Sequence, residues 1–242
     1  MKYLSLSFLL FLVACTNFKK ELTAQQIIDK TILFSGAEKV ANSEINFTFR
    51  DKAYFAYRQK GQFKLIREFD SIIDGLTNTG FSRFVNFKEQ ILSDKQISSY
   101  SNAVNSVHYF SVLPFGLNDA AVHKLKLPNS FINGKEYYKI QISFSEDGGG
   151  EDHEDVFVYW IGKDDFLVDF LAYSYNTNGG GKRFRVLKEQ CVKEGIRFVD
   201  YHNYKPSSKD ILLTNLDKAF ENDKLEKVSE IILKNIEVTL LQ

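Results

Sequence analysis

Short stretches of alternating apolar and polar residues recur along most of this chain. Ile45, Phe47 and Phe49 alternate with polar neighbours, and residues 138–144 repeat the pattern. Alternation of this kind places every second side chain on one face of a β-strand. The predicted strands cover residues 45–49, 54–58, 63–69, 76–87, 138–144, 156–161, 166–175, 184–192, 196–204 and 229–241. Because they follow one another at hairpin spacing, the pattern favours an antiparallel sheet or open barrel over βαβ units.

Dipeptides that end in glycine separate several of these strands. Lys60-Gly61, Asp74-Gly75 and Asn133-Gly134 each predict a turn, and Asn-Gly is the strongest short hairpin signal among them. The run Val156–Ile161 is apolar on both faces. This strand is therefore expected to be covered on both sides.

Residues 23–35 carry apolar side chains at helical spacing on one face. Thr23 and Gln26 stand in the positions of a capping box, and Gly36 is a natural stop. The segment is therefore predicted to be an amphipathic helix that lies on another element.

Two later segments also interrupt the strands. Residues 94–112 predict a helix, and residues 216–222 predict a short helix or turn. We therefore expect a mainly β protein of the α+β class. Its core would be a single curved antiparallel sheet or half-barrel, covered by the N-terminal helix and by internal plug helices. No repeat or linker divides residues 23–242, which form one predicted domain.

The first fifteen residues have the form of a bacterial secretion signal. Lys2 supplies a short positive region, and residues 4–13 form an apolar stretch too short to cross a bilayer. The segment ends in Leu12-Val13-Ala14-Cys15, which resembles the lipobox of bacterial lipoproteins. That resemblance implies removal of residues 1–14 and lipidation of Cys15. The alternative is an ordinary signal peptide with an incidental cysteine.

A lipid on Cys15 would set the location of the protein. Residues 15–22 would form a lipidated tether, and several acyl chains on one residue hold a membrane firmly. Thr16 stands where the general sorting rule for bacterial lipoproteins places Asp in proteins kept at the inner membrane. No acidic run follows the cysteine. The expected location is the outer membrane, facing the periplasm.

Charge and cysteine content exclude several classes of protein. The 31 basic residues are balanced by 31 acidic residues, so binding of nucleic acid through bulk charge is excluded. Cys191 is alone once Cys15 is lipidated, which excludes an internal disulfide and a cysteine-rich metal site. Because Cys191 lies in a strand-like run, we interpret it as a buried structural residue rather than a nucleophile.

An acidic loop offers a candidate cation site. Residues 146–155 contain six carboxylates, one histidine and three glycines, and oxygen ligands on a pliable backbone suit a hard cation. The candidate ligands are Asp152, His153 and Asp155. The spacing of an EF-hand is missing, so the alternative is a solvated hairpin loop.

Other motifs give no cofactor. The glycines 179–181, with Lys182 and Arg183, would suit an anion, but the same glycines are explained by a turn. The sequence contains no P-loop, dinucleotide fingerprint or nucleophile elbow. Its histidines lie on separate predicted elements and form no zinc motif; they are His108, His123, His153 and His202.

The arrangement of a long antiparallel sheet, an N-terminal helix and internal plug helices resembles the lipoprotein-localisation carriers of the LolA/LolB type. A closer likeness is to an uncharacterised family of bacterial lipoproteins. It rests on residues 108–117, 148–161, 169–175 and 197–201. Some members of that family bear enzyme names such as deoxyribose-phosphate aldolase. The chain does not support that name, because such an enzyme needs alternating helices and strands with a Schiff-base lysine.

Aromatic residues are unusually frequent. The sequence contains 22 Phe, 12 Tyr and one Trp, whereas Met1 is its only methionine. In a filled sandwich these rings would form the core, and in an open half-barrel they would line a cavity for an apolar ligand. Periodicity does not separate the two arrangements. The candidate ligand-binding residues are Phe47, Phe49, Phe55, Tyr57, Tyr159, Trp160, Tyr173 and Tyr175.

Three functions fit this sequence. The first is a lipid-anchored periplasmic protein that binds an apolar or lipid-like ligand, or the acyl chain of a lipoprotein, without covalent chemistry and without a cofactor. The second is a structural or assembly lipoprotein that presents a surface to an envelope partner. The third is a hydrolase-like enzyme with His108, His153 or Cys191 in its active site.

Overall fold

The computed structural model describes residues 21–147, 154–176 and 179–242. Its helices are α1 (Ala24–Ser35), η1 (Ala37–Asn42), α2 (Asp94–Ser111), η3 (Leu213–Asn215) and α3 (Leu216–Glu221). Its strands are β1 (Ser43–Phe49), β2 (Lys52–Gln59), β3 (Gln62–Phe69), β4 (Ile72–Thr77), β5 (Gly80–Val85), β6 (Lys88–Glu89), β7 (Val122–Ile132), β8 (Lys135–Phe144), β9 (Val156–Gly162), β10 (Val168–Tyr175), β11 (Gly181–Lys193), β12 (Ile196–Pro206), β13 (Leu225–Ile231) and β14 (Lys234–Leu240).

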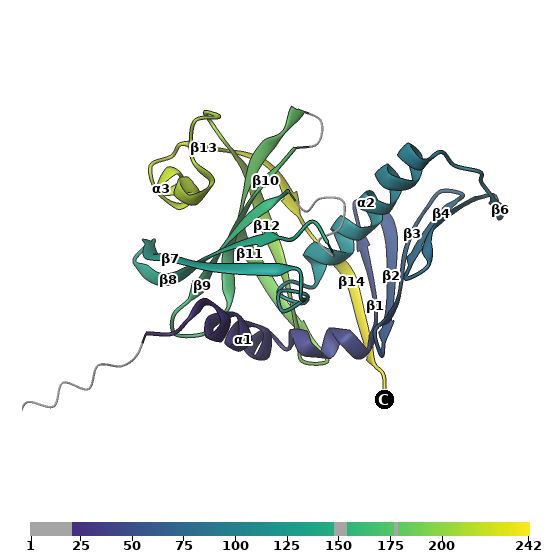
Figure 1. Ribbon diagram of the computed structural model, residues 1–242, viewed down its shortest axis with the longest axis horizontal. Helices are drawn as coiled ribbons and strands as arrows, with labels where there is room; N and C mark the ends of the chain where they lie inside the picture. Colours follow the sequence, from purple (N-terminus) through teal and green to yellow (C-terminus); the bar gives the residue numbers. More distant parts are fainter. Residues whose placement is uncertain (1–20, 148–153, 177–178) are drawn as a thin grey trace, which may run out of the picture.

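Within the described residues the strands form two antiparallel sheets of seven strands each (Figure 1). Sheet A has the order β14-β1-β2-β3-β4-β5-β6, and sheet B has the order β13-β12-β11-β10-β9-β8-β7. Neither sheet closes on itself. The predicted class, a mainly β open half-barrel with covering helices, is confirmed, but the strands divide between two sheets instead of forming one.

The division occurs inside the predicted strand 229–241. Ile231 packs in the core of sheet B, whereas Leu233 packs in the core of sheet A. The backbone N–H of Leu233 donates a hydrogen bond of 2.9 Å to a side-chain carboxylate oxygen of Asp200 on β12. The chain therefore leaves one sheet and enters the other at this point.

The N-terminal helix forms as its sequence predicts. In α1 the side chain of Thr23 accepts from the backbone of Gln26, and the side chain of Gln26 accepts from the backbone of Thr23. Gly36 ends the helix in the left-handed conformation, and a Cβ there would overlap the backbone carbonyl of Gly195. Ile27 and Ile28 are fully buried against sheet B. One end of this sheet is thus covered by α1.

Two of the three predicted turns are confirmed. Lys60-Gly61 and Asn133-Gly134 connect adjacent strands, with positive φ at both positions of each pair. Asp74-Gly75 is instead in the middle of β4, so this prediction is wrong. Asp74 is fully buried and fits a strand because cross-strand arginines satisfy its carboxylate.

The carboxylate of Asp74 joins three elements. It accepts hydrogen bonds from Arg67 on β3 at 2.6 Å and from Arg83 on β5 at 2.6 Å. The guanidinium of Arg83 also lies 3.4 Å from the centre of the Tyr100 ring on α2. This cluster holds the first half of α2 on sheet A.

The second half of α2 rests on the same sheet through apolar contacts. Val104 is fully buried in a core with Phe47 and Tyr54. His108 lies edge-on to both rings, and its Nε2 is 3.0 Å from the carbonyl oxygen of Ile66. The predicted helix 94–112 is confirmed, and its apolar face belongs to sheet A.

The face of sheet B that points away from α2 has its own core under α3. Trp160 and Phe184 are fully buried there, next to Leu216. The indole N–H of Trp160 and the ammonium of Lys139 both donate to Asp217, at 3.1 and 2.9 Å. Strand β9 is thus covered on both faces, as its apolar run predicted.

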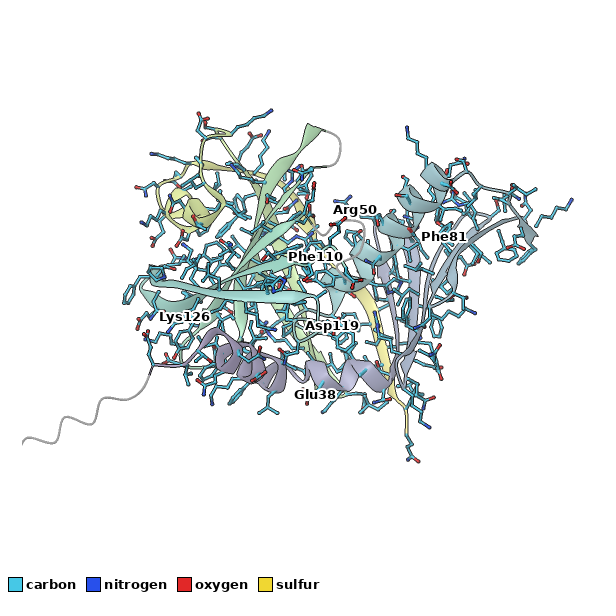
Figure 2. The ribbon with its side chains drawn as sticks, viewed as in Figure 1. Glu38, Arg50, Phe81, Phe110, Asp119 and Lys126 are labelled. Atoms are coloured by element: carbon cyan, nitrogen blue, oxygen red, sulfur yellow. The ribbon has the colours of Figure 1, made fainter. Side chains whose placement is uncertain are left out.

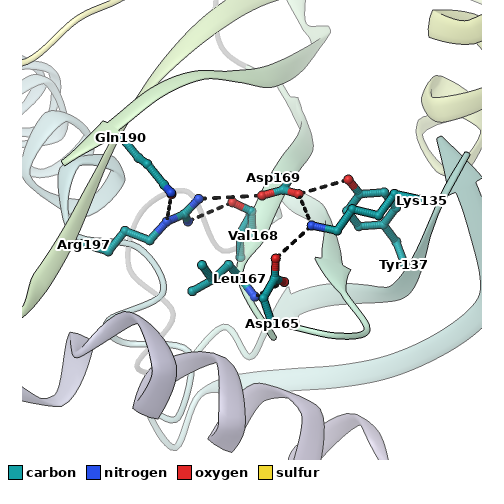
Figure 3. Close-up of polar contacts among 8 residues, drawn as sticks. All are labelled: Lys135, Tyr137, Asp165, Leu167, Val168, Asp169, Gln190 and Arg197. Carbon is teal, nitrogen blue, oxygen red and sulfur yellow. Dashed lines mark hydrogen bonds and ion pairs between the residues drawn. The ribbon is translucent and has the colours of Figure 1, made fainter. Parts of the chain in front are cut away.

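A network of charged side chains ties β8, β10 and β12 together (Figure 3). Lys135 donates to Asp165 at 2.9 Å and to Asp169 at 2.8 Å. Arg197, which is 7% exposed, donates to the carbonyl of Val168 at 2.9 Å and lies 3.7 Å from Asp169. Because each carboxylate here already has a cationic partner, we interpret the network as structural.

We predict that Asp74→Asn destabilises the protein by about 3 kcal/mol, because it leaves two arginines without their buried counter-charge. Urea denaturation measures the change in the free energy of unfolding. Glu226→Gln is the control, since the Glu226–Lys205 ion pair is exposed and should contribute less than about 1 kcal/mol. Equal effects of the two substitutions would contradict the role assigned to Asp74.

We also predict that His108 makes the protein sensitive to acid. Burial lowers the pKa of His108 to about 3, against 6.5 for a free histidine, so the folded state holds the ring neutral. The stabilisation is complete above pH 6.5 and is lost as the pH falls toward 3, by about 1.4 kcal/mol for each pH unit. His108→Gln should flatten this part of the stability profile. His123→Gln, at an exposed position, should leave it unchanged.

Candidate functional site

A cavity of about 1090 Å³ lies between α2 and sheet B. The helix lies between the two sheets, with β10 and β12 on one side of it and β1 to β3 on the other (Figure 1). Because the apolar face of α2 is used against sheet A, its other face is left toward sheet B. The cavity is therefore a consequence of which sheet holds the helix.

The wall formed by sheet B is mainly apolar. It is built from side chains that alternate along neighbouring strands and so share one face of the sheet. Aromatic rings predominate in it, together with three aliphatic side chains. The apolar and tyrosine side chains of this wall are Val122, Phe144, Phe157, Tyr173, Tyr175, Val199, Tyr201 and Ile231.

The wall formed by α2 is polar. Ser98, Asn102 and Asn105 recur at helical spacing and all line the cavity, as do Ser99 and Ser106. Small hydroxyl and amide groups leave space beside the helix and supply hydrogen-bonding atoms. The cavity thus has one aromatic wall and one polar wall, which suits an amphiphilic ligand better than a pure hydrocarbon.

The last turns of α2 close one part of this space. Phe110 points from α2 toward sheet B (Figure 2), and its ring centre is 5.1 Å from that of Tyr173. Tyr109 lies beside it and contacts Phe157. Burial raises the pKa of Tyr109 to about 12, so its hydroxyl remains protonated. Tyr109 and Phe110 thus form the plug that was predicted for the internal helices.

Charged groups also line the cavity. The cations are Lys95, Arg183 and Arg185, and the carboxylates are Asp119 and Asp155. Burial raises the pKa of Asp119, although the positive charge of Lys124 opposes this shift. Arg183 belongs to the glycine-rich segment that was predicted to suit an anion, whereas no sequence pattern indicated Arg185. An arginine in strict alternation with apolar residues is typical of a solvent-facing position.

Lys182 does not take part in this site. Its ammonium donates to the carbonyl oxygens of Lys209 and Ile211, both at 2.8 Å. Gly179 and Gly180 adopt positive φ, as a turn requires. Of the two basic residues predicted to bind an anion, Arg183 therefore lines the cavity and Lys182 does not.

The structure separates the predicted aromatic residues into three groups. Phe49, Tyr173 and Tyr175 line the cavity. Phe47, Tyr159 and Trp160 are 3% exposed or less, and they pack in the cores of sheets A and B instead of lining the cavity.

Phe55 and Tyr57 form the third group. They alternate on β2 with the buried residues Tyr54 and Ala56, so they lie on the face of sheet A that is turned away from the core. They do not line the cavity.

The residues considered for catalysis do not come together among the described parts of the chain. His108 is buried under sheet A, and His153 lies outside the described residues. Cys191 is exposed, so the prediction that it is buried is wrong. The reason is that β11 extends past Val186, where its pairing with β10 ends, and this part of the strand pairs with β12 alone.

The candidate cation site is only partly described. Asp152 and His153 lie outside the described residues, whereas Asp155 lines the cavity. Across residues 21–147, 154–176 and 179–242, no group of three or more His, Cys, Asp or Glu side chains is placed to hold a metal ion. In the same part of the chain, no helix has both the length and the apolarity needed to cross a membrane.

Solved structures with a similar arrangement exist. A DUF1329 family protein from Desulfovibrio piger shares the fold with a TM-score of 0.54 and 10% sequence identity, over 88% of this chain and 92% of that chain. A LolA superfamily protein from Nitrosomonas europaea is similar with a TM-score of 0.47 and 10% identity, over 92% and 94% of the two chains. A putative outer membrane lipoprotein-sorting protein domain from Vibrio parahaemolyticus has a TM-score of 0.48 and 7% identity, over 90% and 94%.

A LolA superfamily protein is thus one of the solved structures to which this chain is similar. Among curated proteins, none matches the chain. The family model described as a family of unknown function, DUF6503, matches residues 3–232, nearly the whole chain, and the protein therefore belongs to that family.

Proposed function

We propose that the protein binds an apolar or lipid-like ligand, either a free lipid or the acyl chain of a lipoprotein, between α2 and sheet B. The observation that carries this proposal is the cavity of about 1090 Å³ with its aromatic wall. Ligand pockets in proteins commonly have volumes of about 300–1,000 Å³. A volume at the top of this range suits a long acyl chain better than a small metabolite.

Burial of the ligand's acyl chain would supply most of the binding affinity. Each methylene group transferred from water contributes about 0.8 kcal/mol, so eight methylenes contribute about 6 kcal/mol before the entropy of association is subtracted. The proposed role needs no bond to be made or broken. It is a binding or carrier function and not an enzymatic one.

The proposed location is the outer membrane, on its periplasmic side. Support comes from the sequence Leu12-Val13-Ala14-Cys15 behind an apolar stretch, which lies outside the described residues. A lipid on Cys15 would hold the cavity close to a supply of lipid.

Binding is tested by native mass spectrometry of the protein from residue 15 onward, carrying Cys15→Ser and purified after incubation with a lipid extract of bacterial envelopes. We predict a co-purifying lipid, and we predict that Ser106→Trp removes about nine-tenths of it by filling the space beside α2. Leu33→Trp is the control, because Leu33 is 65% exposed on α1. If both variants retain the lipid, the cavity is not its site; a protein without any lipid would refute the proposal.

The anchor is tested in the full chain. We predict that Cys15→Ser moves the protein from the membrane fraction to the soluble fraction and abolishes labelling by radioactive palmitate. Cys191→Ser is the matched control and should leave both unchanged, since Cys15 and the signal before it are intact. Palmitate labelling that survives in Cys15→Ser would show that the lipobox resemblance is misleading.

A further inference from the structure

Arg185 is a buried cation on the wall of the cavity. It comes from β11 and is 7% exposed. Its guanidinium lies 3.9 Å from the centre of the Phe110 ring and donates one long hydrogen bond, 3.4 Å, to the hydroxyl of Tyr173. Its Nε has no hydrogen-bond partner, and no described carboxylate forms an ion pair with it.

Two other buried cations of the described chain are paired, whereas Arg58, 8% exposed, has no ion pair among the described residues and lies over the ring of Phe115. Lys139 donates to Asp217 at 2.9 Å, and Arg197 has the carboxylate of Asp169 at 3.7 Å. A buried charge without a counter-charge is costly to fold around. Arg185 and Arg58 both lack such a counter-charge, but of the two it is Arg185 that lines the cavity.

The surroundings of Arg185 favour an anion. Arg183 lines the same wall two residues away, on the same face of β11. The hydroxyl of Tyr109, on α2, is also buried and lies beside the hydroxyl of Tyr159. Of the carboxylates that line the cavity, Asp119 forms no ion pair with Arg185 among the described contacts, and Asp155 has an interaction of its own. A ligand that reaches this point meets the unsatisfied Nε donor of Arg185.

We propose that Arg185 binds the anionic head of an amphiphilic ligand, a carboxylate or a phosphate monoester, while the apolar chain of that ligand lies along the aromatic wall. The proposal rests on the function proposed above and names its ligand class. The Nε and Nη groups of a guanidinium form a fork that matches two oxygens of a carboxylate or phosphate. A bound anion would give Nε its hydrogen bond and neutralise the buried charge.

The test separates the contribution of the ligand's anionic head from that of its apolar chain. The protein from residue 15 onward, with Cys15→Ser, is titrated with the neutral apolar dye N-phenyl-1-naphthylamine. The bound dye is then displaced by dodecanol, laurate or dodecyl phosphate. Acetate and inorganic phosphate test the anion without a chain. We expect laurate or dodecyl phosphate to bind about tenfold more tightly than dodecanol, and the short anions to displace nothing.

Arg185→Gln should abolish this preference and leave the affinities for the dye and for dodecanol within about twofold of their original values. Arg58→Gln is the matched control. Arg58 is 8% exposed, also has an unpartnered guanidinium nitrogen and lies outside the cavity lining. Its replacement should keep the tenfold preference. Arg185→Lys retains the positive charge without the forked guanidinium and should keep part of the preference. This variant replaces Arg185→Gln in the test if Arg185→Gln does not fold.

The outcomes distinguish the two proposals. If neither the dye nor any twelve-carbon compound binds, the proposed function itself fails. If dodecanol and both anionic compounds bind equally well, the cavity binds apolar chains and the role of Arg185 is refuted. A preference that survives in Arg185→Gln, or that is lost in Arg183→Gln instead, also refutes it. A preference for only one of the anions identifies the head as carboxylate or phosphate.

Discussion

The attachment of α2 to sheet A determines what the rest of the molecule can do. An apolar face of the helix meets the sheet through Val104 and the ring contacts of His108, and the Asp74 cluster fixes the helix near its start. A helix can bury one face without desolvating its polar side chains. With that face used on sheet A, the serines and asparagines of α2 are turned toward sheet B, and close packing against the aromatic wall is prevented.

Rigidity is a second property of this arrangement. Beyond Met1 the sequence contains no methionine, so the wall is built from rings and branched side chains that have few rotamers. Neighbouring rings fix one another, as in the stack of Phe157 and Tyr173 with centres 5.6 Å apart. Such a wall presents one shape to a ligand, and it is less able to adapt than a methionine-rich surface.

Features set by nearby residues could be predicted from the sequence, and features set by distant partners could not. The limits of α1 follow from Thr23, Gln26 and Gly36, which act within one turn of the helix ends. Asp74 looks like a turn residue until Arg67 and Arg83 are brought to it across two strand pairings. Its place in a strand therefore depends on the register of the sheet.

The site shows the same division. The sequence predicted aromatic residues on strands, but Tyr159 and Trp160 are neighbours in β9 and point into cores on opposite faces. Which rings remain free to line a cavity depends on what covers each face, and this is decided by α2 and α3. Arg185 was missed for a related reason, because its burial comes from Phe110 on a helix more than seventy residues away in the chain.

The crossing at Ile232 and Leu233 has a mechanical consequence. The polar wall of the cavity is held on sheet A, the aromatic wall belongs to sheet B, and no strand ladder joins the two sheets in the described chain. Apolar side chains couple the two sheets instead, because Ile196 and Phe198 of β12 are buried in the core of sheet A. A change in the width of the cavity would therefore disturb this shared core, although it would break no strand pairing within either sheet.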